Sequence, residues 1–387
     1  MFRKIFLTCF FASSLLYFSA SFVSATNFYV SKNGNNSSGT SWSSAWNELD
    51  QINWSSVNPG DTVYVDGSST ACSRQTTITN STAKPTSDTG NNCGMTYTTM
   101  LDPEKAGTAT NPITIKLSTE SGRNGTAIFF GGRSTSLPYC GQTNYTYRAG
   151  LRQPVDLRGK QNLTIDGIKW GGIKIYGGVY GVTFNSTSNN LTLKHLEIFD
   201  NGKDGPNLSG VNMPGSNITI ERSMIHNNGQ DAIDSGGGTN HFTLKQSWLY
   251  NSRPHPTQTN EPFNYCTHSD GIQVYNGRDQ YDIHVEDSII GPGFMQGLLL
   301  GDHVSNWAIA TVHNFTLKNS LLVGYHGSSN NALIYTKYDP NSSYPNNPPT
   351  NYLLDHVTAY KDPDRNWWNI QLHGSGHTIS YSCILDT

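Results

Sequence analysis

Three aspartates lie at equivalent positions of two short, similar segments, where their carboxyl groups could perform acid–base chemistry. Asp231 and Asp234 belong to the segment DAIDS, and Asp270 begins the segment DGIQVY. Parallel strands lie ~4.8 Å apart, so if these segments are neighbouring strands, Asp231 lies beside Asp270. Two carboxyl groups this close raise each other's proton affinity, which suits an acid that stays protonated near neutral pH.

Side chains alternate between the two faces of a strand, and this alternation predicts which groups face outward. Ile233 and Ile272 should point into a core, so Asp234 and Gln273 should point outward. The predicted acidic cluster on one exposed face consists of Asp231, Asp234 and Asp270, with His268 beside them. Such a cluster indicates a site for general acid–base catalysis.

A structural interpretation of the same residues competes with the catalytic one. Asp-Gly is a turn signal, and Asp270 is followed by Gly271. Asp231 and Asp270 would then only cap turns in a polar ladder, and His268 would be an ordinary surface or turn residue.

Internal repetition predicts the elements that position these groups. One phrase begins at Asn162 (NLTIDGIKW), Asn190 (NLTLKHLEIF), Asn217 (NITIERSMIH), His241, Asp282, Asn314, Asn351 and Gly376, at intervals of 28, 27, 24, 41, 32, 37 and 25 residues. A second phrase lies between the first ones, at Gly210, Asp231, Asp270, Gln296, Asn331 and Asn369. Both phrases alternate apolar and polar residues, which is the period of a strand.

A repeat of about 24 residues suits one coil of a parallel β-helix, because each unit buries its apolar edge only by stacking on the next. The predicted fold is therefore all-β: a single-stranded, right-handed parallel β-helix, a solenoid that spans residues 61–387. The segments GDTVYVDG at Gly60 and NPITIKL at Asn111 look like earlier, less regular coils.

The two ends of the chain carry different signals. Residues 1–25 have a basic start, an apolar stretch and a small-residue cleavage site, which predicts a secretory signal peptide and a secreted or periplasmic protein. Residues 26–60 should form an N-terminal strand and a short capping helix that carries Trp46, Leu49 and Ile52 over the open end of the stack. The repeat continues to Asp386 without such a cap, so that end is either covered by an oligomer partner or truncated.

Composition and cysteines narrow the class of protein further. Only 14% of the residues are charged and the formal net charge is −3, which offers no general attraction for nucleic acid. No stretch after the signal peptide is apolar enough to span a membrane. In an exported protein, Cys72 and Cys93 flank a polar loop and are the favoured disulfide pair. Cys140, Cys266 and Cys383 leave at least one cysteine without a partner.

The opening NFYVSKNGNNSSGTSWSSAW, the following NPGDTVYVDG and the repeats together resemble the pectate-lyase-like superfamily of right-handed parallel β-helix proteins. The resemblance covers the mature chain and is specific for the fold but weak for the reaction. It implies a carbohydrate-active protein, since the superfamily includes lyases, hydrolases and phage tailspikes. Fold alone does not establish function.

The local motif order resembles that of polygalacturonases, with key residues changed. Asp231 and Asp234 match the first motif, but Ser269 replaces the first aspartate of the second, where Asp270 remains. Gln296 replaces a histidine, and Ile334 replaces an arginine, with Lys337 near the place of a lysine. These departures make ordinary polygalacturonase activity unexpected.

The resemblance implies two uses of the same aspartates. Two carboxyl groups on neighbouring coils could hydrolyse a glycosidic bond by either stereochemical course. In β-elimination, family lyases use Lys, Arg, His or Tyr as the base, often with Ca²⁺ held by aspartates. Asp231, Asp234 and Asp270 are then candidate calcium ligands, and the alternative is a protein without a cofactor. Candidate bases or substrate-binding residues are His268, Lys337, Gln273, Tyr275, Arg278 and Gln296.

Three functions are compatible with these observations. The favoured one is an exported enzyme that cleaves a polysaccharide, expected to be acidic, in a groove beside the aspartates. The second is a non-catalytic, adhesin-like β-helix that binds glycans or cell surfaces. The third is a structural stack whose loops contact a protein partner.

Overall fold

The computed structural model describes the chain from Ala25 to Asp386 with internal gaps. The described residues are 25–72, 93–132, 153–201, 210–212, 214–229, 231–236, 238–252, 270–275, 280–294, 296–301, 312–324, 333–336, 348–361 and 370–386. The predicted signal peptide lies almost wholly outside them. Within them, no helix is long and apolar enough to cross a membrane.

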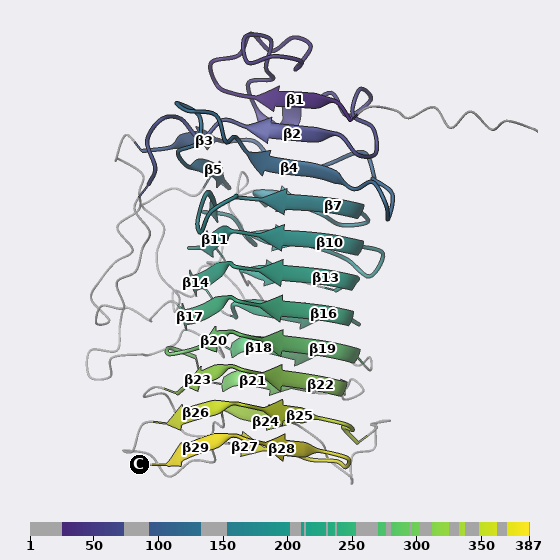
Figure 1. The fold of residues 1–387 in the computed structure, drawn as a ribbon, viewed down its shortest axis with the longest axis vertical. Helices are drawn as coiled ribbons and strands as arrows, with labels where there is room; N and C mark the ends of the chain where they lie inside the picture. The colour runs from purple at the N-terminus through teal and green to yellow at the C-terminus, as the bar shows by residue number, and fades with distance from the viewer. Residues whose placement is uncertain are drawn as a thin grey trace, which may run out of the picture.

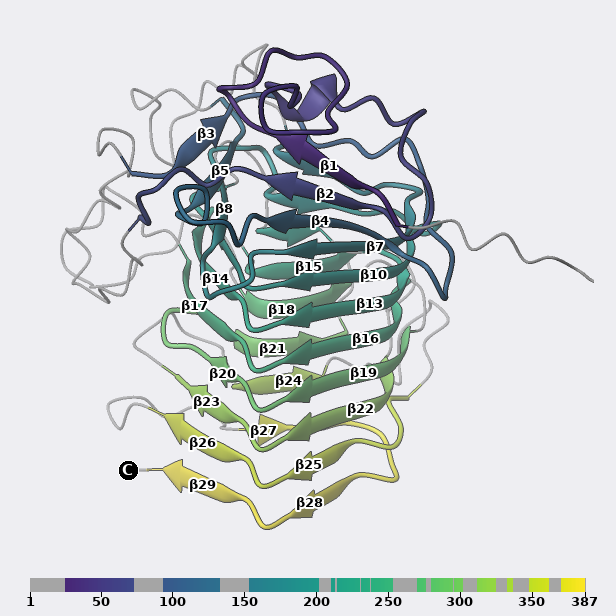
Figure 2. The same ribbon diagram turned by 45° about the horizontal axis from the view of Figure 1, so that its top comes forward.

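Three parallel sheets run the length of the molecule and form a β-helix (Figures 1 and 2). Sheet A contains β1 (Asn27–Val30), β2 (Thr62–Val65), β4 (Ile113–Leu117), β7 (Gln161–Asp166), β10 (Asn189–Lys194), β13 (Ser216–Glu221), β16 (Asn240–Lys245), β19 (Gln280–Glu286), β22 (Val312–Lys318), β25 (Leu353–Asp355) and β28 (Thr378–Ser380). Sheet B contains β3 (Met95–Tyr97), β5 (Ala127–Phe130), β8 (Ile173–Tyr176), β11 (Leu196–Phe199), β14 (Met224–Asn228), β17 (Trp248–Ser252), β20 (Ile289–Ile290), β23 (Leu321–Val323), β26 (Thr358–Lys361) and β29 (Cys383–Asp386). Sheet C contains β6 (Val155–Asp156), β9 (Val182–Thr183), β12 (Val211–Asn212), β15 (Ile233–Gly236), β18 (Asp270–Tyr275), β21 (Gln296–Leu300), β24 (Ile334–Thr336) and β27 (Ile370–Gln371).

Each regular coil contains three strands, because the first repeated phrase supplies two of them. In the coil that begins at Asn217, β13 and β14 are separated by only Arg222 and Ser223. Arg222 has a φ of 47°, in the left-handed region, and this residue turns the chain from sheet A into sheet B. Ser223 then accepts a hydrogen bond from the N–H of Leu196 in the preceding coil, at 3.1 Å. The second phrase supplies the strands of sheet C.

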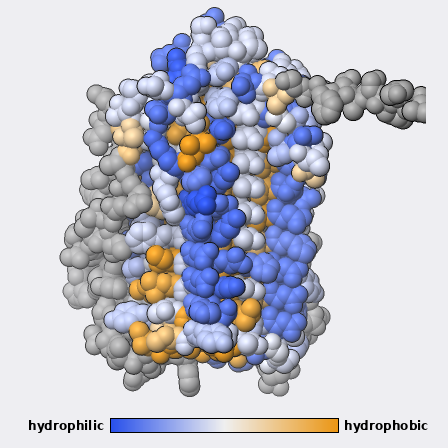
Figure 3. Space-filling model, viewed as in Figure 1, coloured by the Kyte–Doolittle hydropathy of each residue, from blue (hydrophilic) through white to orange (hydrophobic). Residues whose placement is uncertain are grey.

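The strands stack in strict register, so equivalent residues form columns along the molecule. The inward columns of all three sheets, such as Ile165, Leu193 and Ile220, make one continuous core. On the outer side of sheet A, opposite charges alternate at the strand ends, where Figure 3 shows a hydrophilic strip. This charge column consists of Lys116, Asp166, Lys194, Glu221, Lys245, Glu286, Lys318 and Asp355. Opposite charges on paired strands stabilise that pairing.

The N-terminal end of the stack is covered, but the predicted capping helix is wrong. Only one 3₁₀ turn, η1 (Leu49–Gln51), forms there. Trp46, Leu49 and Ile52 are nevertheless buried and belong to the core cluster. The backbone between them is held in part by side-chain hydrogen bonds from elsewhere in the chain, for example from the N–H of Asp50 to Oγ1 of Thr99 at 3.1 Å.

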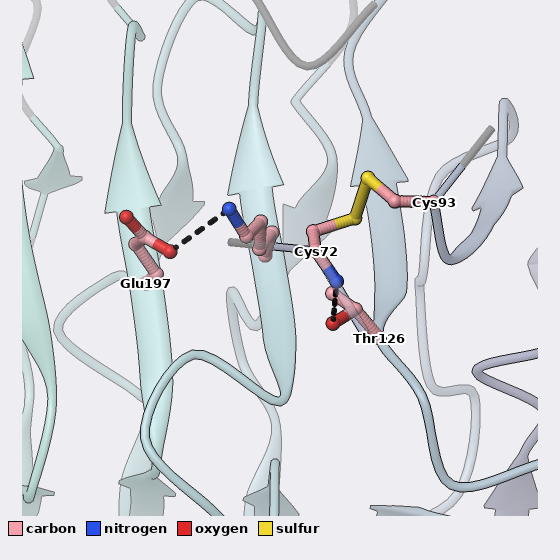
Figure 4. Close-up of a disulfide and its surroundings, with 5 residues drawn as sticks. Cys72, Cys93, Thr126 and Glu197 are labelled. Carbon is pink, nitrogen blue, oxygen red and sulfur yellow. Dashed lines mark hydrogen bonds and ion pairs between the residues drawn. A yellow bond between two sulfur atoms is a disulfide. The ribbon is translucent and has the colours of Figure 1, made fainter. Parts of the chain in front are cut away.

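A disulfide joins Cys72 to Cys93, the pair that the sequence favoured (Figure 4). The N–H of Cys72 donates a hydrogen bond to Oγ1 of Thr126 at 3.0 Å. Cys72 also packs against a small hydrophobic cluster on the outer side of sheet B, formed by Ile128, Tyr176, Phe199 and Phe130. The disulfide therefore ties an N-terminal segment to that face.

Candidate functional site

The chain bends where it enters sheet C, and this bend sets the direction of the candidate acidic residues. Ala232 and Ile233 are consecutive, yet both belong to the buried core. Two adjacent inward residues interrupt the alternation, so Asp231, just before them, lies on the outer side. Gly271, the next coil's counterpart of Ala232, also faces inward, since a Cβ there would lie 2.7 Å from Ile290 Cγ2.

Asp231 and Asp270 lie side by side on neighbouring coils, as predicted. The N–H of Asp270 donates a hydrogen bond to Oδ1 of Asp231 at 2.7 Å, and the N–H of Ala232 donates to the carbonyl of Asp270 at 2.9 Å. Gln296 is the partner of Asp270 in the next coil. These three residues form the first outer column of sheet C, which begins at the corner between sheets B and C.

A second outer column of sheet C runs parallel to the first. It consists of Asn212, Asp234, Gln273, Leu299, Tyr335 and Gln371. The column changes along the stack from a carboxylate and an amide to an aliphatic and an aromatic side chain. Leu299 is 2% exposed although it does not belong to the core cluster. Such a mixture of polar groups and flat apolar surface fits a carbohydrate, which presents hydroxyl groups and C–H faces.

Burial is the main difference between the prediction and the structure. Asp231, Asp234 and Asp270 are each 0% exposed, and Gln273 and Gln296 are 6% and 5% exposed. The sequence predicted an exposed acidic face. The difference arises because alternation along a strand predicts which side a residue faces, but not whether that side is exposed to solvent.

The glycine after Asp270 has a packing role instead of a turn role. Asp270 is the first residue of β18, and Gly271 belongs to the strand. A Cβ on Gly271 would lie 2.4 Å from the carbonyl oxygen of Gly297 in the next coil. The Asp-Gly pair therefore reflects close stacking at the corner. The capping interpretation holds for Asp231, whose Oδ1 accepts the N–H of the following coil.

Several predicted site residues cannot be placed. His268, Arg278 and Lys337 lie outside the described residues. Tyr275 ends β18, with only its backbone described. The calcium prediction has no matching geometry, because no group of three acidic, His or Cys side chains in the described ranges is arranged to hold a metal ion. We therefore derive no step that depends on calcium.

A buried ionic cluster that the sequence did not reveal lies on the outer side of sheet B. Nζ of Lys174 lies 3.2 Å from Oε2 of Glu197, the dashed contact of the labelled Glu197 in Figure 4. Nε2 of His226 lies 3.1 Å from Oε1 of the same carboxylate. The side chains of all three residues are at most 1% exposed. Burial opposes the charge of Glu197, but His226 and Lys174 outweigh it and hold the pKa of this carboxyl below its ordinary value.

Aromatic rings surround this cluster and fix the imidazole. His226 stacks between Phe199 and Tyr250, with ring centroids 5.3 Å and 4.5 Å away and planes within 10° of parallel. Tyr176 continues the stack on the other side of Phe199, at 5.0 Å. The carboxylate of Glu197 orients the imidazole through Nε2, which is how acid–base histidines are commonly held.

The ionic cluster and the aspartates flank the same corner of the β-helix. His226 belongs to β14, and Asp231 follows five residues later at the entry to sheet C. Five residues span at most about 18 Å, so the two groups lie within reach of one extended ligand. The sequence signal for the cluster was present in LEIF and SMIH, as polar residues at the outer positions of strands. It was missed because these segments were not recognised as a third sheet.

Comparison with known proteins identifies the fold. The complex of XylC with xylose is 10% identical, with a TM-score of 0.50 over 87% of this chain and 67% of that one. An alginate lyase from Paenibacillus sp. str. FPU-7 is 15% identical, with a TM-score of 0.47 over 83% and 95%. Pectate lyase Pel9A is 16% identical, with a TM-score of 0.40 over 86% of this chain and 63% of its own length, so this chain spans less than two thirds of that protein.

No protein-family model and no curated protein matches this chain in sequence. The fold is the parallel β-helix that the sequence predicted. At these sequence identities the likeness establishes the fold alone.

Proposed function

We propose that this protein is an exported carbohydrate-active β-helix that cleaves a polysaccharide at the corner between sheets B and C. The observation that carries the proposal is the Asp231–Asp270 pair, two carboxyl groups on neighbouring coils with a third, Asp234, in the adjacent outer column. Buried carboxyl groups at one place are a common basis of acid–base catalysis. The outer column of sheet C supplies a surface along which a chain of sugars can lie.

The two carboxyl groups suit different roles. Asp231 accepts a backbone N–H, which favours the ionised carboxylate, so we assign it as the base. Asp270 then donates a proton to the glycosidic oxygen as the bond to the sugar carbon breaks. In hydrolysis, Asp231 takes a proton from the attacking water, whose oxygen forms the new bond to that carbon. In β-elimination, the base takes the proton beside the uronate carboxylate, and a carbon–carbon double bond forms as the leaving oxygen departs.

An acidic polysaccharide is the expected substrate class. Arg278 follows β18 by three residues, and Lys337 follows β24 directly. Basic groups of this kind could balance the uronate carboxylates of an acidic chain; both residues lie outside the described part of the chain, so their part in the proposal rests on the sequence.

The test uses the mature protein on a panel of neutral and acidic polysaccharides, with added calcium and with chelator in parallel. New reducing ends and the ultraviolet absorbance of an unsaturated uronate are followed together. Both signals rising identify a lyase, and reducing ends alone identify a hydrolase. Loss of activity in chelator would indicate that the aspartates bind a metal ion. If neither reducing ends nor ultraviolet absorbance rises with any polysaccharide of the panel, the proposal is contradicted.

One observation favours a second function, non-catalytic glycan binding. All three aspartates are fully buried, whereas cleavage requires that a substrate contact them. A binding protein needs no such access, because a glycan could contact the outer surface alone. Saturable binding of a polysaccharide that stays intact after long incubation would identify this function.

A further inference from the structure

A polar groove lies along the edge where the strands of sheet A begin, away from the corner that carries the aspartates. It has a volume of about 710 Å³. Its lining comes from successive coils and consists of Gln161, Ser186, Thr187, Ser188, Asn189, Ser216, Asn217, Asn240, His241, Tyr281 and Asp282. Sheet C strands end on this side and begin at the other, so the groove and the aspartates lie at opposite ends of sheet C.

The repeat itself builds this groove from two columns of side chains. The first column contains the paired residues Gln161, Asn189, Ser216, Asn240 and Tyr281. The second contains the residues that follow them, Asn162, Asn190, Asn217, His241 and Asp282, which all have φ between 53° and 59°. Asparagine tolerates this left-handed conformation better than most residues, which explains why it recurs at the start of each phrase. Figure 3 shows the resulting hydrophilic strip at the right of sheet A.

Amide groups in these columns bind one another and keep further capacity for a ligand. Within the groove, Nδ2 of Asn217 donates to Oδ1 of Asn189 at 2.8 Å; just outside its lining, Nδ2 of Asn190 donates to Oδ1 of Asn162 at 2.6 Å. Each amide has a second N–H and a second lone pair, and these pairs are exposed to solvent. The groove therefore offers donors and acceptors at the coil spacing of ~4.8 Å.

The charge of the groove is close to neutral. Its lining contains no Lys or Arg, and its one carboxylate, Asp282, pairs with His241, whose Nδ1 lies 3.2 Å from Oδ2. An anionic chain would gain nothing from such a surface, whereas the hydroxyl groups of a neutral chain match its amides and hydroxyls.

An exposed aromatic ring lies in the coil at one end of the groove. Tyr281 is 41% exposed and stacks on His313 of the next coil, with ring centroids 5.0 Å apart and planes 17° from parallel. The N–H of Tyr281 donates to Oδ1 of Asn240 at 3.1 Å. Aromatic side chains with a polar tip are suited to partly wet contacts, and such a ring can pack against the C–H face of a sugar.

We propose that this amide groove binds a neutral glycan chain, with one sugar on Tyr281 and the following sugars hydrogen-bonded along the amide columns. The site would hold the protein on a neutral polysaccharide while the corner between sheets B and C is free to act. The inference does not depend on catalysis at that corner, since it rests on different residues at the opposite end of sheet C.

The test measures the binding of xylohexaose and cellohexaose by calorimetry, with hexagalacturonate as the acidic comparison. Tyr281→Ala should weaken binding of the neutral chain about tenfold. Asn217→Gly removes one amide of the groove and still permits the left-handed backbone, so it should weaken binding several-fold without unfolding the coil. The neutral chains should bind more tightly than hexagalacturonate.

Two matched variants serve as controls. Asn351→Gly removes an amide from the same left-handed column, where Nδ2 donates to Asn314 at 3.1 Å, but lies outside the groove. Tyr360→Ala removes a ring that is 39% exposed on sheet B. Both should leave binding unchanged, and circular dichroism checks that every variant is folded. Absence of binding by both neutral chains, equal binding after Tyr281→Ala, or stronger binding of hexagalacturonate overturns the proposal. Polysaccharide cleavage that persists in Tyr281→Ala would show that the groove and the corner between sheets B and C act independently.

Discussion

Asp231 and Asp270 are paired, and Asp231 uses its carboxylate to hold the backbone of the next coil. In Asp270→Ala the N–H that donates to Asp231 remains, because it belongs to the main chain. We therefore expect Asp270→Ala to abolish polysaccharide cleavage and to leave the melting temperature nearly unchanged. Reducing-end assays and calorimetric melting measure the two effects.

Asp231→Ala is the matched comparison for this pair. It leaves the buried N–H of Asp270 without its acceptor, which costs about 1–3 kcal/mol of unfolding free energy. Equal destabilisation by both variants, with cleavage retained in Asp270→Ala, would make the pair a structural element of the corner.

Glu197 is the residue on which the buried ionic cluster depends, because it contacts both Lys174 and His226. Glu197→Gln leaves two buried partners without their carboxylate, so we expect it to lower the unfolding free energy by roughly 3–5 kcal/mol. Glu221→Gln is the control, since Glu221 pairs with the half-exposed Lys245 at 3.1 Å on the outer side of sheet A. Its effect should stay below about 1 kcal/mol. Equal effects in chemical denaturation would contradict this ranking.

The same carboxylate predicts an acid dependence of stability. Its pKa lies below the ordinary value of 4.5 in the folded protein. A lowered pKa contributes stability above the unfolded-state value and loses it as the pH falls through the folded value. Stability should therefore fall as the pH drops below about 4.5, and Glu197→Gln should flatten this part of the profile. A profile identical to that of the unaltered protein would assign the acid sensitivity to other carboxylates.

Residue positions were predictable where the repeat determines them and not elsewhere. The neighbours Asp231 and Asp270 follow from alternation and coil stacking, which the sequence displays directly. Their burial does not follow, because alternation determines the side that a residue faces and not its exposure to solvent. Lys174, Glu197 and His226 were missed because a single left-handed residue, such as His195 or Arg222, separates sheets A and B. A one-residue turn leaves the apolar alternation almost uninterrupted.

At the scale of elements, the charge column on sheet A offers a direct test of coil pairing. Lys245 lies between Glu221 and Glu286 in register. Lys245→Glu would place three carboxylates in adjacent strands, and like charges on paired strands are destabilising. We expect a loss of about 1–2 kcal/mol at low salt, smaller in high salt because the charges are exposed. Lys245→Gln removes only the attraction and should cost less. A loss independent of salt would point to packing of the lysine stem instead.

The N-terminal cap shows how a correct apolar pattern led to the wrong element. The spacing of Trp46, Leu49 and Ile52 fits one face of a helix, and all three residues do cover the core. The segment before them is rich in Ser, Asn and Gly, and its short side chains bind one another and the backbone locally, as Ser41 and Ser44 do at 2.8 Å. Such local bonds compete with helical ones. Apolar packing on the core therefore determines which residues are buried, and the local hydrogen bonds of the polar residues determine the backbone path.

At the scale of the whole molecule, the two ends of the stack differ in how far the core is covered. The first coils are covered by the buried N-terminal segment, whereas the last described coil exposes apolar side chains of β28 and β29. Ile379 and Ile384 are 49% and 42% exposed, although their partners in the preceding coil, Leu354 and Ala359, are fully buried. Within the described chain, nothing pairs with the outer edges of these strands. Unpaired edges beside an apolar surface favour association.

We expect two copies of the polypeptide of residues 26–387 to associate through this end, because identical strand edges can pair antiparallel across a twofold axis. Sedimentation should show a mass that rises with concentration, and the doubly substituted Ile379→Lys, Ile384→Lys protein should remain monomeric with little change in melting. Ile289→Lys is the control, since Ile289 is 37% exposed in the middle of the stack. Cys383 lies exposed on β29, so the experiment is repeated in reductant to separate strand pairing from disulfide cross-linking. A monomer at every concentration would mean that the last described coil is stable with its apolar side chains exposed. Pairing with the preceding coil would then be sufficient to hold β28 and β29 in place.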